Sequence, residues 1–242
     1  MEWSFWEISL GVAAGLLVGF SKTGIPAAGL LIVPIMALLF PAKLSVGVLL
    51  PMLILGDIQA IGYYRHYAHY RELIRLVPGT LVGMIAGASF LFQVDNEVMG
   101  RTIGALVLLM LALESLRTVF SRISTDHGVF PWIFGAFAGA ASTMGNAAGP
   151  IVSLYLLSRS LPKEVFMGTA AWFFLVINIV KVPLFVCLEM ITLEGLFFDV
   201  TLIPVILFGG WMGVAVLSRI TQSFFNRLIL VLSAAIGLQL LI

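Results

Sequence analysis

The chain has 242 residues, of which 61% are hydrophobic and only 10% are charged. A soluble domain needs a charged surface to face water, so this composition excludes a soluble globular protein and indicates a polytopic helical membrane protein. The net charge of +1 gives no indication of nucleic-acid binding, and the single cysteine, Cys187, excludes an intrachain disulfide and a cysteine metal cluster.

The first apolar segment, residues 5–40, is too long for one span, since a single helix of that length would measure ~50 Å against a hydrocarbon core of ~30 Å. Small residues interrupt it in the stretch Gly15-Leu-Leu-Val-Gly-Phe-Ser-Lys-Thr-Gly-Ile-Pro-Ala-Ala-Gly29. We expect a helical hairpin with a non-helical tip formed by Ser21, Lys22, Thr23 and Gly24. No basic segment precedes it, so we expect the first helix to be retained rather than cleaved as a signal peptide.

Three continuous apolar runs follow, and most approach the ~20 residues that cross a bilayer. They predict helices over residues 44–63, 76–92 and 99–118. With the hairpin, these helices form a first repeat over residues 1–120.

The second half of the chain repeats this organisation. A second broken apolar segment over residues 130–158 predicts another hairpin, and continuous runs predict helices over 165–188, 200–218 and 225–242. A shift of 120 residues places Thr23 on Thr143, a shift of 121 places Asp57 on Asn178, and a shift of 126 places Gly83 on Gly209. Residues 121–242 therefore form a predicted second repeat. Paired hydrophobic segments interrupted by Gly and Pro point to the binding site of a secondary transporter.

The second repeat is predicted to be inverted, because a hairpin returns to the side it entered and each half then crosses an odd number of times. Loop charges test this independently. The loop over 64–75 contains three arginines and one acid, whereas the matching loop over 188–199 contains three acids and no base. The positive-inside rule places the first loop in the cytoplasm and the second outside, with both termini outside. Parallel halves with a weak charge bias are the alternative.

Both hairpin tips are candidates for an anion site. Lys22 supplies a positive charge, and a half-helix beginning at this tip would direct free backbone N–H groups toward a ligand. The second tip, formed by Ser142, Thr143, Gly145 and Asn146, supplies hydroxyl and amide groups instead. Alternatively, Lys22 extends to the membrane interface, the glycines permit close packing, and the hydroxyls bond to their own helices.

Asp57 and Lys181 are buried charges within predicted spans, where a charge needs a partner or a water-filled cavity. Their positions within their helices place them ~12 Å apart in depth. We therefore expect Asp57 to pair with Lys22, and Lys181 to face the second tip and contribute to substrate binding. Asp57 and its repeat equivalent Asn178 are candidates for coupling or gating. The alternative is that Asp57 and Lys181 pair with each other for packing.

The two tips resemble the two signatures of the TauE/SafE family of sulfite exporters. Gly19-Phe-Ser-Lys-Thr-Gly24 with Pro26-Ala-Ala-Gly29 is similar to the first, and Gly139-Ala-Ala-Ser-Thr-Met-Gly-Asn-Ala-Ala-Gly-Pro150 is similar to the second. The resemblance implies export of sulfite, sulfoacetate and related organosulfur anions across a bacterial inner membrane. It also implies a site at Ser21, Lys22, Thr23, Gly24, Ser142, Thr143, Gly145 and Asn146.

We therefore expect an all-α integral membrane protein that exports a small oxyanion, first of all sulfite or an organosulfonate, by alternating access of one repeat against the other. Its partners are then this anion and membrane lipids, not nucleic acid, and a homodimer is left open. The sequence contains no phosphate loop, metal-ligand spacing or nucleophile constellation, so we expect no catalytic residue, cofactor or metal. The alternatives are an anion channel with the same hairpins and a membrane assembly or sensor subunit without flux.

Overall fold

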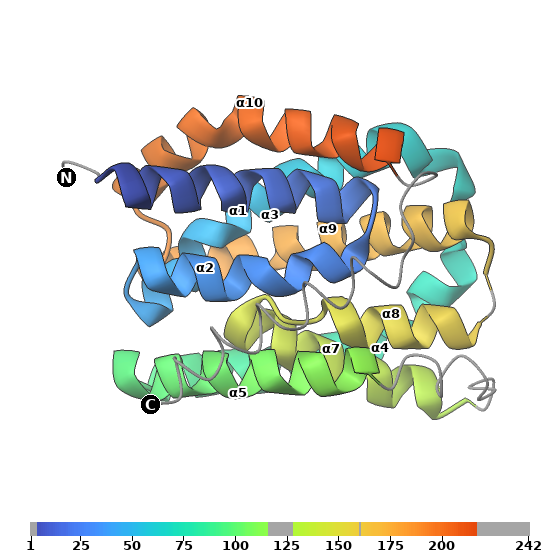
Figure 1. Ribbon diagram of the computed structural model, residues 1–242. Helices are drawn as coiled ribbons and strands as arrows, with labels where there is room; N and C mark the ends of the chain where they lie inside the picture. The colour runs from blue at the N-terminus through green and yellow to red at the C-terminus, as the bar shows by residue number, and fades with distance from the viewer. Residues whose placement is uncertain (1–3, 116–127, 160, 217–242) are drawn as a thin grey trace.

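The computed structural model describes residues 4–115, 128–159 and 161–216, and over these residues every regular element is a helix (Figure 1). Six of the described helices are long and apolar enough to cross a membrane. The protein is therefore an all-α integral membrane protein, as predicted. The predicted helix over 225–242 and the last residues of those over 99–118 and 200–218 lie outside the described residues.

The first hairpin begins with a long helix, α1 (Phe5–Thr23), whose Ser4 side chain accepts a hydrogen bond from the Glu7 backbone N–H. Its 19 residues correspond to ~28 Å. The chain returns through a 3-10 helix, η1 (Pro26–Leu31), and α2 (Ile32–Leu39). The expectation of two half-helices is therefore wrong for the first arm, which is one helix over 5–23. The predicted non-helical tip is also wrong for Ser21, Lys22 and Thr23, which lie in the last turn of this helix, because the chain leaves the helix only at Gly24.

The first half continues with α3 (Ala42–Tyr64), η2 (Arg65–Tyr67), α4 (Tyr70–Gln93) and α5 (Asn96–Ser115). Helix α4 begins six residues before the predicted start at residue 76, so most of the segment 64–75 is helical. The apolar run marks only the hydrophobic part of a helix, whereas the backbone hydrogen bonds continue through its polar first turns.

The second half contains α7 (Phe130–Gly145), α8 (Gly149–Ser158), α9 (Lys163–Cys187) and α10 (Leu193–Val216). Helix α10 likewise begins seven residues before the predicted start at residue 200. Asn146 ends α7 in the left-handed conformation, with φ of 54°. Asparagine tolerates this conformation better than most residues, which allows the chain to turn sharply at the second tip.

Helices of the two halves interdigitate, since α1 packs along α10, α4 packs along α7, and α3 packs against α9 between them (Figure 1). Glycines bring the backbones into contact. A Cβ atom at Gly19 would collide with the Ile206 carbonyl oxygen, and one at Gly139 would collide with the Thr80 carbonyl oxygen. Such close approach of small residues is typical of helix packing in membranes. Each of these two close-packed pairs therefore joins a helix of one half to a helix of the other.

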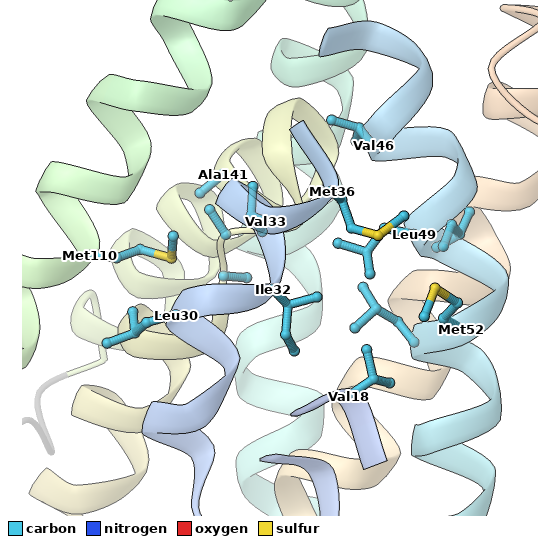
Figure 2. Packing of buried hydrophobic residues seen from close by; sticks show 14 of the residues in the cluster. Val18, Leu30, Ile32, Val33, Met36, Val46, Leu49, Met52, Met110 and Ala141 are labelled. Atoms are coloured by element: carbon cyan, nitrogen blue, oxygen red, sulfur yellow. The ribbon is translucent and has the colours of Figure 1, made fainter. Parts of the chain in front are cut away.

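Buried apolar side chains from both hairpins and from α3 and α5 form the core around the tips (Figure 2). The labelled residues there are Val18, Leu30, Ile32, Val33, Met36, Val46, Leu49, Met52, Met110 and Ala141. Non-helical backbone at membrane depth is tolerated only where protein or a water-filled cavity covers it. This core supplies that cover for the breaks at both tips.

Candidate functional site

A cavity of about 90 Å³ is lined by residues of the two hairpins and of the helices α3, α5 and α9. This volume holds a few water molecules or one small anion. The polar part of its wall is formed by Ser21, Lys22, Ser142, Asn146, Ser153 and Asn178. The rest of the wall is mostly apolar and includes Leu30, Val33, Leu49, Leu53, Met110 and Phe174.

Lys22 forms an ion pair with Asp57 inside this wall. The Lys22 Nζ lies 2.7 Å from Asp57 Oδ1, with the lysine side chain 13% exposed and the aspartate fully buried. Asn178 Nδ2 donates a hydrogen bond of 2.7 Å to Asp57 Oδ2. The ammonium also lies 4.3 Å from the centre of the Phe174 ring, a cation–π distance. The predicted contact between Asp57 and Lys22 is therefore confirmed.

Lys181 is fully buried and holds the second tip. Its Nζ donates to the Ser142 carbonyl oxygen at 3.1 Å, to Ser142 Oγ at 3.0 Å and to Asn146 Oδ1 at 2.6 Å. The prediction that Lys181 faces the second tip is confirmed. An ammonium has three N–H donors, and these three oxygen atoms match them in number. Lys181 therefore lies behind Ser142 and Asn146 and not in the cavity wall.

The depth estimate for Asp57 and Lys181 is wrong. Asn178 hydrogen bonds to Asp57, and Lys181 follows it by three residues, a rise of only ~4.5 Å. The estimate assumed that both helices are centred at one depth, whereas α3 and α9 are displaced along their axes where they meet. The two charged groups nevertheless have different hydrogen-bond partners, as predicted.

Four of the predicted tip residues pack helices and do not line the cavity. Thr23 Oγ1 donates to the carbonyl oxygens of Gly19 at 3.1 Å and Gly210 at 2.7 Å. Thr143 Oγ1 donates to the Gly139 carbonyl oxygen at 2.9 Å. A Cβ atom would meet the Gly213 backbone at Gly24 and the Leu106 side chain at Gly145. The alternative interpretation therefore describes all four residues: the two hydroxyls bond to their own helices, and the two glycines permit close packing.

The first tip continues into the 3-10 helix η1, and the α-helix that begins at the cavity lies at the second tip. Lys22 lies in the last turn of α1, because Gly24 and Pro26 end that helix after Thr23. Helix α8 instead begins at Gly149, which lines the cavity. The first backbone N–H groups of a helix have no partner within the helix, and its N-terminus favours negative charge. An ammonium and a helix N-terminus therefore face one cavity from opposite hairpins.

A family model described as sulfite exporter TauE/SafE matches residues 11–240. The chain belongs to the sulfite exporter TauE/SafE family. No curated protein and no solved structure matches the chain. The resemblance of its two signatures is thus confirmed for nearly the whole chain, and the protein is a multi-pass membrane protein of an exporter family.

Two wall residues of this TauE/SafE protein were missed in the sequence. Phe174 places its ring beside the Lys22 ammonium, and Ser153 adds a hydroxyl from α8. Phe174 lies in a continuous apolar run, so nothing in the sequence distinguishes it from a lipid-facing residue. Ser153 lies outside the signature segments, although a hydroxyl within an apolar helix was a signal that could have been used.

A further buried charge of the TauE/SafE protein lies away from the cavity. Glu72 on α4 is only 2% exposed and accepts hydrogen bonds from the Tyr155 hydroxyl, from Arg159 at 3.1 Å and from Arg75 at 3.3 Å. The sequence placed Glu72 in the basic loop over 64–75 as its single acid. In the structure it connects α4 to the end of α8 and so fixes the return arm of the second hairpin.

Proposed function

We propose that the protein exports a small oxyanion through the cavity between the hairpins, with sulfite or an organosulfonate such as sulfoacetate as first candidates. The observation that carries this proposal is the Lys22 ammonium in the wall of a small cavity, in a chain of the sulfite exporter family. Hydroxyls of Ser142 and Ser153 and the N-terminus of α8 supply further donors for anion oxygens, whereas the Ser21 hydroxyl donates to the Val18 carbonyl oxygen of its own helix.

The helix contacts support an inverted repeat. Gly19 contacts Ile206, and Gly139 contacts Thr80. The repeat shift of 120 residues places Gly19 on Gly139, and the shift of 126 places Thr80 on Ile206, so the two contacts are repeat equivalents. The hydrogen bond between Asp57 and Asn178 joins two residues that are themselves repeat equivalents, 121 positions apart. This is the contact expected at a pseudo-two-fold axis. Figure 1 also shows α1 and α7 running in opposite directions.

This packing changes the expected motion. Rocking one sequence half against the other would separate α1 from α10 and α4 from α7, where glycines bring the backbones into contact. We infer instead that each moving body combines helices of both halves, one containing α1 and α10 and the other α4 and α7. Asp57 and Asn178 join α3 to α9 between these bodies, which suits a coupling or gating role. Small sliding movements of packed helices are a known form of such closure.

The membrane potential supplies a driving force for export. In a cell that is negative inside, exit of one anionic charge is favoured by ~2.3 kcal/mol per 100 mV, so no cation has to accompany it. This proposal places the protein in a bacterial inner membrane, with both termini outside and segment 64–75 in the cytoplasm. This orientation is argued from the basic side chains of segment 64–75, because basic loops of membrane proteins face the cytoplasm.

Cysteine labelling tests this orientation. Cys187 is exposed at the end of α9, so a membrane-impermeant thiol reagent added to intact cells is expected to label it. In a Cys187→Ser background, a cysteine replacing the exposed His66 is expected to react only after the cells are opened. Labelling of both positions in intact cells would contradict the inverted arrangement.

Flux into liposomes tests the transport function. Purified protein in liposomes is expected to catalyse sulfite flux that saturates with concentration and shows counterflow, because a carrier binds its substrate once in each cycle. A linear flux without counterflow would identify an anion channel of the same fold. No flux above protein-free liposomes would favour a membrane assembly or sensor subunit.

The variant Gly149→Ala tests whether the transport route passes through the cavity. Apart from its chain neighbours and its own helix backbone, no atom of the described residues lies within 4 Å of a Cβ atom built at Gly149, so the variant is expected to fold normally while its methyl group narrows the cavity. We expect slower saturable flux with an unchanged melting temperature. A Cβ atom built at Gly62 likewise meets no other part of the described structure within 4 Å, so Gly62→Ala is the matched control. Equal flux in both variants would move the route elsewhere.

A further inference from the structure

Three charged side chains belong to the cavity among the described residues. Lys22 lies in its wall, and Asp57 is bonded to the wall residues Lys22 and Asn178. Lys181 is bonded to the wall residues Ser142 and Asn146. Both Asp57 and Lys181 are fully buried, so water screens neither charge effectively.

We assign a positive charge to Lys181 from its contacts. It meets oxygen atoms at three positions, one of which is the Ser142 carbonyl in the last turn of α7. Carbonyl groups at a helix C-terminus form the negative end of the helix dipole and favour a cation there. The ammonium groups of Lys22 and Lys181 and the carboxylate of Asp57 therefore sum to a net charge of +1 for the protein side chains of the site.

A buried cluster is most stable when its total charge is small, because transfer of net charge from water to a medium of low dielectric constant is costly. One bound monoanion brings the charge of this site to zero. A bound dianion brings the charge of the site to −1. Among the described residues that line the wall, Lys22 is the one cation, so the wall offers no second cation to compensate this charge. The apolar side chains Leu49, Leu53 and Phe174 do not compensate the extra charge.

We propose that the site selects substrates by valence and binds small monoanions in preference to dianions of the same shape. The inference rests on the proposed function, since it assigns the anion to this cavity. Of the candidates named there, hydrogensulfite and singly charged sulfonates fit the site, whereas sulfoacetate, which carries two charges at neutral pH, does not. Asp57 has a defined role in this selection, because its carboxylate cancels one of the two ammonium charges.

The test compares two tetrahedral anions of similar size that differ in charge. Methanesulfonate is a monoanion and sulfate is a dianion at neutral pH. Calorimetric titration of purified protein at constant ionic strength is expected to give a dissociation constant at least tenfold lower for methanesulfonate than for sulfate.

Two variants change the charge of the site in opposite directions. Asp57→Asn raises the net charge to +2 while keeping a side chain of the same shape, so the preference for methanesulfonate over sulfate is expected to fall at least tenfold. Lys181→Met lowers the net charge to zero and is expected to weaken methanesulfonate binding and abolish sulfate binding. Glu97→Gln, whose parent side chain is 72% exposed, removes a negative charge far from the cavity and should leave the preference unchanged.

The outcomes separate this inference from the proposed function. Equal affinity of the wild-type protein for both anions, or a preference that Asp57→Asn leaves unchanged in a folded variant, would overturn the valence rule alone. Tighter binding of sulfate than of methanesulfonate by the wild-type protein would overturn it as well. Failure of the wild-type protein to bind sulfite, methanesulfonate and sulfate would instead remove the anion site on which the proposed function depends.

Discussion

Replacing Lys22 by alanine is expected to weaken sulfite binding about 100-fold. The ammonium is the charged donor in the cavity wall, and a charge-assisted hydrogen bond in a largely dry site contributes up to ~3 kcal/mol, which corresponds to about two orders of magnitude in affinity. Calorimetric titration of the purified variant with sulfite measures the loss directly. The exposed Lys163 gives the control Lys163→Ala, which should bind as the wild type does.

A paired variant separates binding from folding. Lys22→Ala leaves the Asp57 carboxylate buried with only Asn178 as its partner, and an uncompensated buried charge costs ~3–5 kcal/mol. The double variant Lys22→Met with Asp57→Asn removes both charges and avoids this cost. We expect it to fold and to lose anion binding. Wild-type affinity in the folded double variant would show that Lys22 does not hold the anion.

A methyl group at Gly19 is expected to lower the melting temperature by about 6–12 °C. A Cβ atom there would collide with the Ile206 carbonyl oxygen, which is backbone and cannot rotate away, so α1 and α10 must separate. Overpacking of this kind costs up to ~3 kcal/mol, and 1 kcal/mol corresponds to about 2–4 °C for a chain of this length. Thermal unfolding of Gly19→Ala in detergent measures the shift.

The repeat equivalent provides an independent check of this interface. Gly139→Ala meets the Thr80 carbonyl oxygen in the same way, so its melting temperature is expected to fall by a similar amount. Gly62→Ala removes a glycine from a helix where a built Cβ meets no other described segment within 4 Å, and it should be neutral or slightly stabilising. A melting temperature of Gly19→Ala equal to that of Gly62→Ala would contradict the close contact between α1 and α10.

The sequence alone determined the class of the protein, the two interrupted hairpins and the partners of Asp57 and Lys181. Its low charge requires a membrane environment, and the Gly- and Pro-rich breaks identify the tips. The pairing of Asp57 with Lys22 and the direction of Lys181 were predicted correctly although the depth estimate behind them was wrong, because few polar groups are available within the spans and each buried charge needs one. Helix limits were less accurate at α4 and α10, because helices extend beyond their apolar parts.

Only the tertiary structure decided which tip residues face the cavity and which helices pack together. Thr23 and Thr143 point into helix contacts, whereas Ser142 and Phe174 line the cavity, and this depends on the rotation of each helix about its axis. The packing of α1 on α10 and of α4 on α7 depends on contacts between residues more than 50 positions apart. Local composition does not encode rotations or axial displacements, because many arrangements bury the same apolar residues, and the glycine contacts between distant segments select one of them.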